Sequence, residues 1–365
     1  MKKQLMLLGA LLGGTLISQA GVKVAVAPEL GLDSLRVQGV LFSELLTATR
    51  QNPPKVSQSI YEIADGRSEF ALPLSEAANY QILLNNQNGV DFYATPGDNL
   101  EIELRGDGSY NITGTRLMED LNEFRGLLAP IDASYEALMA SGKADRESVM
   151  ALAAQYENVA KDFYASHKDS PAAAYALLEV EGEDFLNLVP TMSEEARKSI
   201  FYPMVEQKEK GVRAQLEKEK MRNELSSGNV EAPDFKLPDL EGKMVSISDF
   251  RGKWIVLDFW GAWCKWCIKG FPALKEAYEK YKGELEVIGI DNRDTPEEWK
   301  AAVARFKLPW INLYNAGNDE SGILAAYLVE GFPTKAIINP EGKVVDITVG
   351  EDPEFFVRLA SLMGK

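Results

Sequence analysis

The sequence predicts an α/β domain at the C-terminal end of the chain, preceded by a small antiparallel β domain and a helical region. Three observations lead to this fold class. Strand-like runs fill residues 22–115, the composition then shifts to Ala, Leu, Glu, Lys and Arg up to residue 225, and strand-like and helical runs alternate from residue 234 onwards. Such alternation is typical of a central sheet covered by helices.

The size and charge of the chain limit its organisation and its partners. Its 365 residues favour two or three domains, because single hydrophobic cores stop growing at about 250–300 residues. The formal net charge of −16 repels phosphate backbones and anionic lipids. We therefore expect no nucleic-acid partner.

Residues 1–20 have the features of a secretory signal peptide. Two lysines follow Met1, an apolar stretch runs from Leu5 to Ile17, and Ala20 ends a small-x-small cleavage site. We expect cleavage after Ala20 and a periplasmic location. An uncleaved anchor is the alternative, but glycines interrupt the stretch, which is shorter than the roughly 20 residues of a membrane span. No cysteine lies near the site, which excludes a lipid-anchored lipoprotein.

Residues 22–115 are predicted to form the small antiparallel β domain. Asn88-Gly89 and Pro96-Gly97-Asp98 are turn signals between strand-like runs. In the second signal, proline fixes φ at one turn position and glycine accepts a positive φ at the next. The strand-like runs are residues 80–84, 90–94 and 100–104.

Residues 116–225 are predicted to be helical. Residues 206–224 mix both charge signs densely, which is typical of a solvated helix face, and His167 is expected to be solvated at a helix end. We expect residues 22–225 to serve docking, or formation of a homodimer, rather than catalysis. One amphipathic helix is marked by apolar residues at helical spacing, namely Val149, Leu152, Tyr156, Val159 and Phe163.

Residues 226–233 have the composition of a linker, and residues 234–365 are predicted to form the α/β domain. Residues 339–342, Asn-Pro-Glu-Gly, form a hairpin turn between the last two strands. Helical runs follow Cys264, Pro296 and Pro353 and surround residues 322–328. The strand-like runs are residues 254–260, 285–290, 310–314, 335–339 and 344–349.

The stretch DFWGAWCKWC, residues 258–267, holds both cysteines of the chain, Cys264 and Cys267. Because the pair lies at a strand-to-helix junction, the first sulfur falls at a helix N-terminus, where free N–H groups and the helix dipole stabilise a thiolate. Cys267 lies one turn further along and can displace a client held on Cys264 as a mixed disulfide. The pair therefore predicts thiol-disulfide exchange.

Other uses of the two cysteines are less well supported. A zinc site needs about four ligands, whereas the chain has two cysteines and one histidine, so we expect no metal and no cofactor. A purely structural disulfide across so short a loop removes little chain entropy. A peroxide-reducing cysteine normally has a threonine three residues before it, and that position is Gly261 here.

The last third of the chain resembles exported thioredoxin-like thiol-disulfide oxidoreductases of the TlpA/ResA type. The resemblance covers residues 230–365 and is carried by APDFKLPDLEGKMVSISDFRGKWIVLDFWGAWCKWC and GFPTKAIINPEGKVV. It implies a thioredoxin-like fold with an extra hairpin before its core. Through the pattern around FYATPGDNLEIEL, residues 22–225 resemble the β-rich domain of unknown function and helical stretch that precede such domains in Bacteroidetes-type bacteria.

The resemblance also implies a client-binding surface beside the dithiol. Pro333 matches the cis-proline that faces the two cysteines in thioredoxin folds, where a proline bond is cis at small cost. It would leave the Phe332 backbone free to pair with an extended client strand. We expect Phe332, Pro333 and Thr334 to contact clients together with Trp263.

Two residues between the cysteines, Lys265 and Trp266, replace the Gly-Pro of ordinary thioredoxins. A cation beside the nucleophile favours the thiolate and makes the couple more oxidising. Trp263 and Trp266 are expected to form an aromatic lip for apolar client segments. Packing of these rings against the helix is the alternative.

Asp258 lies inside the apolar run of residues 254–260, where a buried carboxylate is costly and has a raised pKa. It matches the thioredoxin aspartate that lies behind the second cysteine and accepts its proton through water. An exposed position at the strand end is the alternative. Many TlpA/ResA-type domains instead have a glutamate three residues after the second cysteine, where this chain has Gly270. The proton-transfer role is therefore assigned to Asp258.

Together these observations predict an exported thiol:disulfide oxidoreductase that cycles between the Cys264–Cys267 disulfide and the dithiol. Reduction of client disulfides is preferred, because the Asp258 arrangement resembles reductases, and it would require electrons from a membrane donor. The alternatives are a secreted binding protein with the thioredoxin-like domain as a scaffold, and a dithiol-dependent peroxidase.

Overall fold

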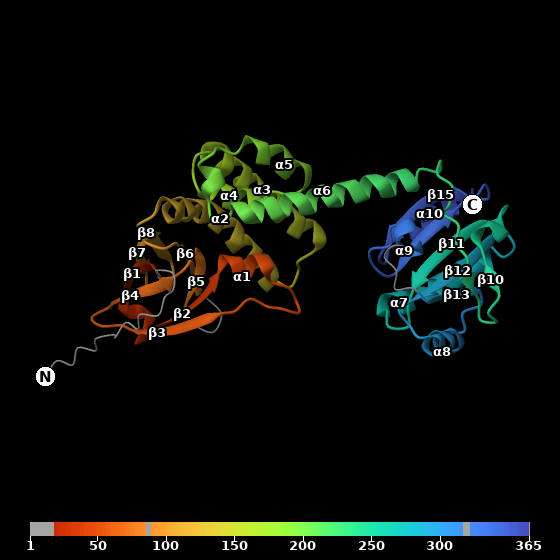
Figure 1. Cartoon of the computed structure of the whole chain (residues 1–365), viewed down its shortest axis with the longest axis horizontal. Helices are drawn as coiled ribbons and strands as arrows, with labels where there is room; N and C mark the ends of the chain where they lie inside the picture. Colours follow the sequence, from red (N-terminus) through yellow and green to blue (C-terminus); the bar gives the residue numbers. More distant parts are fainter. Residues whose placement is uncertain (1–17, 85–88, 317–321, 365) are drawn as a thin grey trace, which may run out of the picture. The chain divides into compact units, whose positions relative to one another are not determined.

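The computed structural model describes residues 18–84, 89–316 and 322–364, and the chain divides into two units, Met1–Arg213 and Ala214–Lys365 (Figure 1). Most of the predicted signal peptide therefore lies outside the described residues. Its last three residues, Ser18 to Ala20, begin strand β1. Among the described residues, no helix is both long enough and apolar enough to cross a membrane.

The N-terminal unit contains two sheets, with strand orders β4-β1-β7-β8 and β3-β2-β5-β6. Residues alternate between buried and exposed along β4 and β7, so one face of the first sheet lies in the core. The strands are β1 (Ser18–Val26), β2 (Ser34–Leu41), β3 (Ser57–Glu62), β4 (Arg67–Leu74), β5 (Ala78–Leu83), β6 (Gly89–Ala94), β7 (Asn99–Leu104) and β8 (Tyr110–Thr113).

The three strands predicted in this unit are confirmed as β5, β6 and β7. The turn at Gly97 is also confirmed, with φ of 97°, whereas Asn88 lies outside the described residues. The prediction of antiparallel pairing is confirmed for β3-β2-β5-β6 and for the pairs β1–β4 and β7–β8. It is wrong for β1 and β7, which pair in parallel. Parallel neighbours need a long connection, and the second sheet lies within the connection between these two strands.

Helices complete the core of the N-terminal unit. The rings of Phe42, Tyr93 and Phe201 pack against one another, which joins a helix, a strand and the residue directly before the helix that begins at Tyr202. The predicted amphipathic helix is confirmed as α3, and residues 206–224 lie in the mostly exposed α6. The helices are α1 (Phe42–Thr47), α2 (Arg116–Ala140), α3 (Arg146–Ser166), α4 (Ala172–Leu178), α5 (Gly182–Leu188) and α6 (Tyr202–Leu225), of which the part up to Arg213 belongs to this unit.

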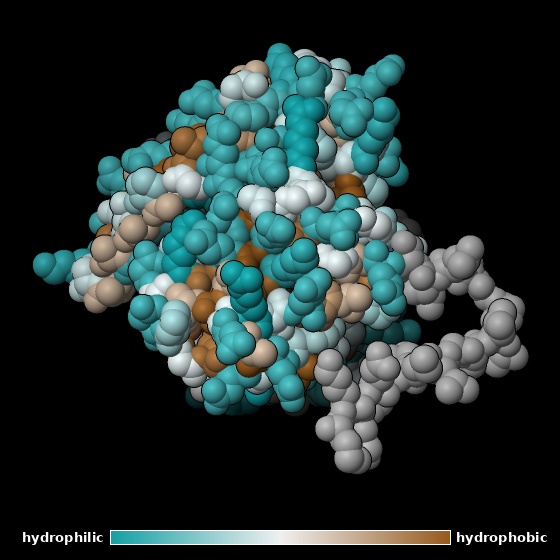
Figure 2. Space-filling model, turned by 90° about the vertical axis from the view of Figure 1, so that its left-hand side faces the viewer, coloured by the Kyte–Doolittle hydropathy of each residue, from teal (hydrophilic) through white to brown (hydrophobic). Residues whose placement is uncertain are grey.

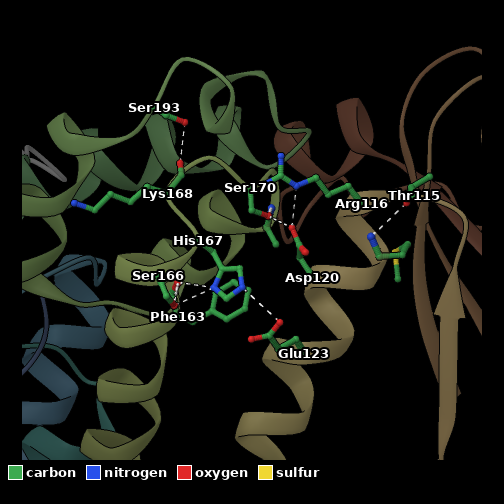
Figure 3. Close-up of polar contacts among 12 residues, drawn as sticks. Thr115, Arg116, Asp120, Glu123, Phe163, Ser166, His167, Lys168, Ser170 and Ser193 are labelled. Atoms are coloured by element: carbon green, nitrogen blue, oxygen red, sulfur yellow. Dashed lines mark hydrogen bonds and ion pairs between the residues drawn. The ribbon is translucent and has the colours of Figure 1, made fainter.

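A polar cluster ties the connection between α3 and α4 to α2 (Figure 3). His167 caps the C-terminus of α3, and its ring stacks on Phe163 with centroids 4.1 Å apart. Its Nε2 lies 3.5 Å from Glu123 Oε2, and Ser170 Oγ donates a hydrogen bond to Asp120. The helix-end position of His167 is confirmed, but the ring is packed rather than fully solvated.

Figure 2 shows the face that forms the left-hand side of Figure 1. Brown hydrophobic side chains are scattered among teal hydrophilic ones and do not gather in one continuous patch. Large apolar patches mark docking surfaces, and no such patch is visible among the described residues on this face. The predicted docking or dimerisation role of residues 22–225 stays a prediction.

The C-terminal unit is built on one sheet with the order β13-β12-β11-β14-β15. The central strand β11 pairs in parallel with β12 and antiparallel with β14. The strands are β11 (Trp254–Trp260), β12 (Leu285–Asn292), β13 (Ile311–Asn315), β14 (Thr334–Ile338) and β15 (Val344–Val349), and the helices are α7 (Lys265–Lys280), α8 (Pro296–Phe306), α9 (Ile323–Ala326) and α10 (Phe355–Leu362).

These elements confirm the predicted alternation of strands and helices, and the fold is a thioredoxin-like α/β domain. The predicted turn is also present, because Gly342 N–H donates to Asn339 O between β14 and β15. Both faces of β11 are buried. Val256 and Trp260 lie in one hydrophobic cluster with the two cysteines, whereas the alternate residues of the strand lie in a second cluster.

The segment before this sheet is held against it. The extra hairpin is confirmed as β9 (Leu237–Pro238) paired with β10 (Met244–Val245). Residues 226–233, predicted as a linker, instead extend the sheet edge, since Gly228 and Ala232 N–H groups donate to the backbone of residues 344 and 342. Leu225 at the end of α6 is buried in the same unit, so these residues are not a free linker.

Candidate functional site

The two cysteines lie where β11 gives way to α7. Cys264 is the N-cap residue of α7, and its Sγ accepts a hydrogen bond from Cys267 N–H at 3.2 Å. The two sulfurs are joined in a disulfide. Cys264 is 5% and Cys267 2% exposed, so the first cysteine lies nearer the surface and the second is inside the helix turn.

Asp258 is buried on the same side of the sheet as the cysteines. Side chains alternate along β11, so Asp258 shares a face with Val256 and Trp260, whose cluster contains both cysteines. The carboxyl is almost fully buried, which excludes the strand-end surface position. Burial raises the pKa of Asp258 above its usual range, and a nearby ammonium group partly opposes that rise.

That ammonium group belongs to Lys335, which the sequence reasoning did not identify. Lys335 is the direct cross-strand neighbour of Asp258 in the β11–β14 pairing, and its Nζ lies 3.6 Å from Asp258 Oδ1. This separation is that of an ion pair and slightly exceeds a direct hydrogen bond. Glu351 Oε1 lies 3.9 Å from the same Nζ on its other side.

The loop before β14 has the predicted proline geometry. The Phe332–Pro333 peptide bond is cis, and Pro333 O accepts a hydrogen bond from Gly350 N–H at 2.7 Å. Within the described part of the chain, the Phe332 backbone has no hydrogen-bond partner. These features leave the backbone of Phe332 able to pair with an added strand.

The side chain of Thr334 does not belong to the predicted client-binding surface. The residue is fully buried, and its Oγ1 donates to Gly331 O at 2.7 Å. Its backbone lies in β14, which pairs with β11 on one side and β15 on the other. The predicted contact of Thr334 with clients is therefore corrected: the side chain fixes the loop that carries Phe332 and Pro333.

Trp263 and Phe332 form an aromatic edge beside the disulfide. Their rings meet edge to face with centroids 5.2 Å apart, and Trp263 Nε1 donates to Asn292 O at 3.0 Å. The Arg293 guanidinium lies over both rings, 5.6 Å from the Trp263 centroid and 5.3 Å from that of Phe332. Because 46% of Trp263 is exposed, core packing does not account for it.

Trp266 lies on the outer surface of the first turn of α7. It is 59% exposed, and Lys269 Nζ lies 4.9 Å from its ring centroid. Packing against the helix core is thereby excluded for this ring. Lys265 is the first residue of α7 and is also exposed; its predicted influence on the redox couple stays a prediction.

Two further features fix the loop before the cysteines. Asp294 Oδ2 accepts from Ala262 N–H at 2.5 Å. A Cβ atom at Gly261 would lie 2.4 Å from Trp263 Nε1 and 2.8 Å from Asn292 O, so no larger residue fits there without a shift of the loop. The absence of a threonine at this position thus has a steric reason.

Asp291, at the end of β12, is a second buried carboxyl that the sequence reasoning missed. It is fully buried, and among the described residues neither carboxyl oxygen has a hydrogen-bond partner. Burial, with smaller contributions from Asp294 and Glu298, raises the pKa of Asp291 to about 9. Across residues 18–84, 89–316 and 322–364, no group of His, Cys, Asp and Glu side chains is arranged to hold a metal ion.

Comparison with known proteins agrees with this arrangement. The model of the AhpC/TSA family matches residues 229–347. Thiol-disulfide oxidoreductase ResA of Bacillus cereus is 38% identical over 122 residues, which are 33% of this chain and 69% of the relative. The chain belongs to this family of thiol-disulfide oxidoreductases. ResA of Bacillus subtilis is 34% identical over 138 residues, 37% of this chain and 74% of the relative.

Solved structures of the family are also similar to this chain. The thioredoxin domain of a thiol-disulfide oxidoreductase from Bacteroides vulgatus is 31% identical, with a TM-score of 0.35, and the match covers 37% of this chain and 96% of that domain. The reaction of the protein is thiol-disulfide exchange, as family membership and the dithiol predict.

Proposed function

We propose that the protein reduces disulfides of exported client proteins, with Cys264 attacking and Cys267 resolving. The observation that carries the proposal is the position of Cys264 at the N-cap of α7, where its sulfur accepts the Cys267 N–H. In the reduced protein this N–H and the helix dipole would stabilise the Cys264 thiolate, which is the attacking species.

The exchange transfers two electrons and two protons to the client. The Cys264 thiolate bonds to one client sulfur, the client S–S bond breaks, and the departing client thiolate takes up a proton. Cys267 then gives its proton to Asp258 and bonds to the Cys264 sulfur. The bond between Cys264 and the client breaks, and the second client sulfur leaves as a thiolate that takes a proton from solvent. The products are a client dithiol and the Cys264–Cys267 disulfide, which a membrane electron donor would reduce again.

The client would bind as an extended segment across the site. The Phe332 backbone, which has no hydrogen-bond partner among the described residues, supports pairing with a client strand. The exposed rings of Trp263 and Trp266 support contact with apolar client side chains. These three residues, together with Pro333, form the proposed client-binding surface.

We also place the protein in the periplasm, after removal of the signal peptide at residues 1–20. The proposal rests on the charged start, the apolar stretch and the small-x-small site of the sequence. Mass spectrometry of protein isolated from its own cells tests it, since cleavage after Ala20 leaves Gly21 as the first residue. Recovery of the intact N-terminus would contradict export by this route.

A Cys267→Ser variant tests the exchange mechanism with clients. Without its resolving thiol, the variant should accumulate mixed disulfides between Cys264 and client proteins. A reductant should cleave these disulfides and release the clients. Cys264→Ser is the matched control and should trap nothing. If no exported protein is trapped, the alternative function is favoured, namely a secreted binding protein with the thioredoxin-like domain as a scaffold.

The redox potential of the cysteine pair decides the direction. A reductase should have a potential near that of thioredoxin, about −270 mV. A value near about −120 mV, which is typical of strong oxidants, would overturn the reductase assignment.

A further inference from the structure

A buried lysine lies between two carboxylates, one of which is that of Asp258. Lys335 Nζ is 3.6 Å from Asp258 Oδ1 and 3.9 Å from Glu351 Oε1. Only 8% of the Lys335 side chain is exposed. An uncompensated ammonium group is rarely tolerated at this depth, so the two carboxylates explain why a lysine can occupy β14.

The three groups lead from the interior to solvent. Asp258 is the innermost, with 2% of its side chain exposed, whereas 34% of the Glu351 side chain is exposed. Lys335 bridges them because strand register places it directly across from Asp258. Glu351 follows the turn at Gly350, whose N–H is bonded to Pro333 O, so its position is fixed by the loop of the cis-proline.

Glu351 also contacts the helix that carries the cysteines. A Cβ atom added to Gly270 would lie 2.8 Å from Glu351 Oε1. Gly270 is three residues after Cys267 in α7, and residues at this spacing share one helix face. The glycine therefore makes room for the Glu351 carboxylate one helical turn from the resolving cysteine.

We propose that Lys335 and Glu351 are positioning residues for the resolving step, which hold the Asp258 carboxyl and link its proton to solvent. The proposal rests on the proposed function, because it concerns the step in which Cys267 displaces the client. In that step the Cys267 thiol loses its proton to Asp258, its sulfur bonds to Cys264, and the bond between Cys264 and the client sulfur breaks. The departing client thiolate takes a proton from solvent.

The two positioning residues act on Asp258 with opposite sign. The Lys335 ammonium lowers the pKa of Asp258, and the Glu351 carboxylate raises it, both against the background of burial. Among the described residues, Lys335 and Glu351 are the charged groups that perturb this carboxyl, and its β12 neighbour in the sheet is the uncharged Gly289. Removal of each charge should therefore move the resolving step in opposite directions.

The experiment uses the reduced full chain and 5,5′-dithiobis(2-nitrobenzoate) as the probe. Attack by Cys264 releases one thionitrobenzoate, and resolution by Cys267 releases a second, so the two steps appear as two phases in one trace. In Lys335→Met the pH midpoint of the second phase should rise by about 1 unit. Its rate at neutral pH should then fall about tenfold, since one pH unit corresponds to a factor of ten.

Glu351→Gln should move the same midpoint downward. Lys335→Arg should keep the midpoint of the unaltered chain, because the positive charge is retained. Gly270→Ala offers a test without any change of charge, since the new methyl group displaces the Glu351 carboxylate while alanine stabilises the helix. It should act in the direction of Glu351→Gln. Lys300→Met and Glu354→Gln, which change exposed residues, are the matched controls.

The outcomes separate this inference from the proposed function. Unchanged midpoints in Lys335→Met and Glu351→Gln, or shifts in the same direction, would overturn the role of the pair while the first phase still shows attack by Cys264. Absence of the first phase in the unaltered chain would overturn both. If Lys335→Met does not fold, Glu351→Gln and Gly270→Ala still decide, because they change only the partly exposed end of the cluster.

Discussion

Replacement of Asp291 by asparagine should make the C-terminal unit less sensitive to alkaline pH. Asp291 is fully buried, and its oxygens have no hydrogen-bond partner among the described residues. Its pKa is raised to about 9, first by burial and then by Asp294 and Glu298. In the folded chain the group is therefore protonated at neutral pH, whereas in the unfolded chain it is ionised.

The sign of the effect follows from proton linkage. An acid whose pKa is raised on folding contributes stability that is present below its ordinary pKa of 3.8 and is lost as the pH rises towards the folded pKa of about 9. Each pH unit within that window changes the free energy of unfolding by at most about 1.4 kcal/mol. From pH 5 to pH 8 the upper bound is about 4 kcal/mol, and solvent relaxation around the carboxyl should reduce it to about 1–3 kcal/mol.

Tryptophan fluorescence is a selective probe for this measurement. All six tryptophans, Trp254, Trp260, Trp263, Trp266, Trp299 and Trp310, lie in the C-terminal unit. Urea unfolding of the full oxidised chain, followed by fluorescence at pH 5 and pH 8, therefore reports on that unit. Other titrating groups affect both proteins equally, so the difference between the original chain and Asp291→Asn isolates the one carboxyl.

The expected result is that the stability of Asp291→Asn relative to the original chain is higher at pH 8 than at pH 5, with an unchanged dependence on urea. Glu297→Gln, which alters an exposed carboxylate on α8, should show no such difference between the two pH values. Equal stability differences at both pH values would refute the argument, because they would mean that Asp291 is not held protonated by the fold.

Two further perturbations test other parts of the structure. Trp263→Ala should weaken client binding, which would raise the KM for a protein disulfide but not for a small-molecule disulfide. The lost hydrogen bond to Asn292 O should cost about 1 kcal/mol of stability. Equal effects on the KM of both substrates would contradict the proposed client-binding surface. Phe124→Ala should cost about 3–5 kcal/mol in the N-terminal core, measured by far-UV circular dichroism. Leu127→Ala, at a 49% exposed position of the same helix, should cost much less, and similar losses would refute that packing.

The C-terminal fold was accessible from sequence because its signals are local. The predicted strand bounds at residues 254–260 and 344–349 agree with β11 and β15, since buried apolar runs between turn residues have few alternatives. The place of Cys264 at a helix N-cap followed from the same local reasoning. Burial of Asp258 followed from its apolar neighbours in one strand.

Features that depend on pairing between distant segments could not be predicted from the sequence. The parallel pairing of β1 with β7 depends on where the chain returns after the whole second sheet. Residues 228–232 form hydrogen bonds with the sheet edge through backbone groups. Because almost every residue type has these groups, the linker-like composition did not indicate the pairing. A lysine in the buried strand β14 was the one visible signal for the ion pair, but its partner depends on the register of β11 and β14.

The two cysteines of the dithiol differ in the groups that favour loss of their protons. Cys264 is at the N-cap, where backbone N–H groups and the helix dipole favour its thiolate without any particular side chain. Cys267 lies inside the turn and is nearly fully buried, so its proton needs a specific acceptor. Asp258, held by Lys335 and Glu351, is on the same face of the sheet. Loss of the Lys335 charge should therefore slow the release of clients, and loss of the Glu351 charge should not, while both leave the capture of clients by Cys264 unchanged.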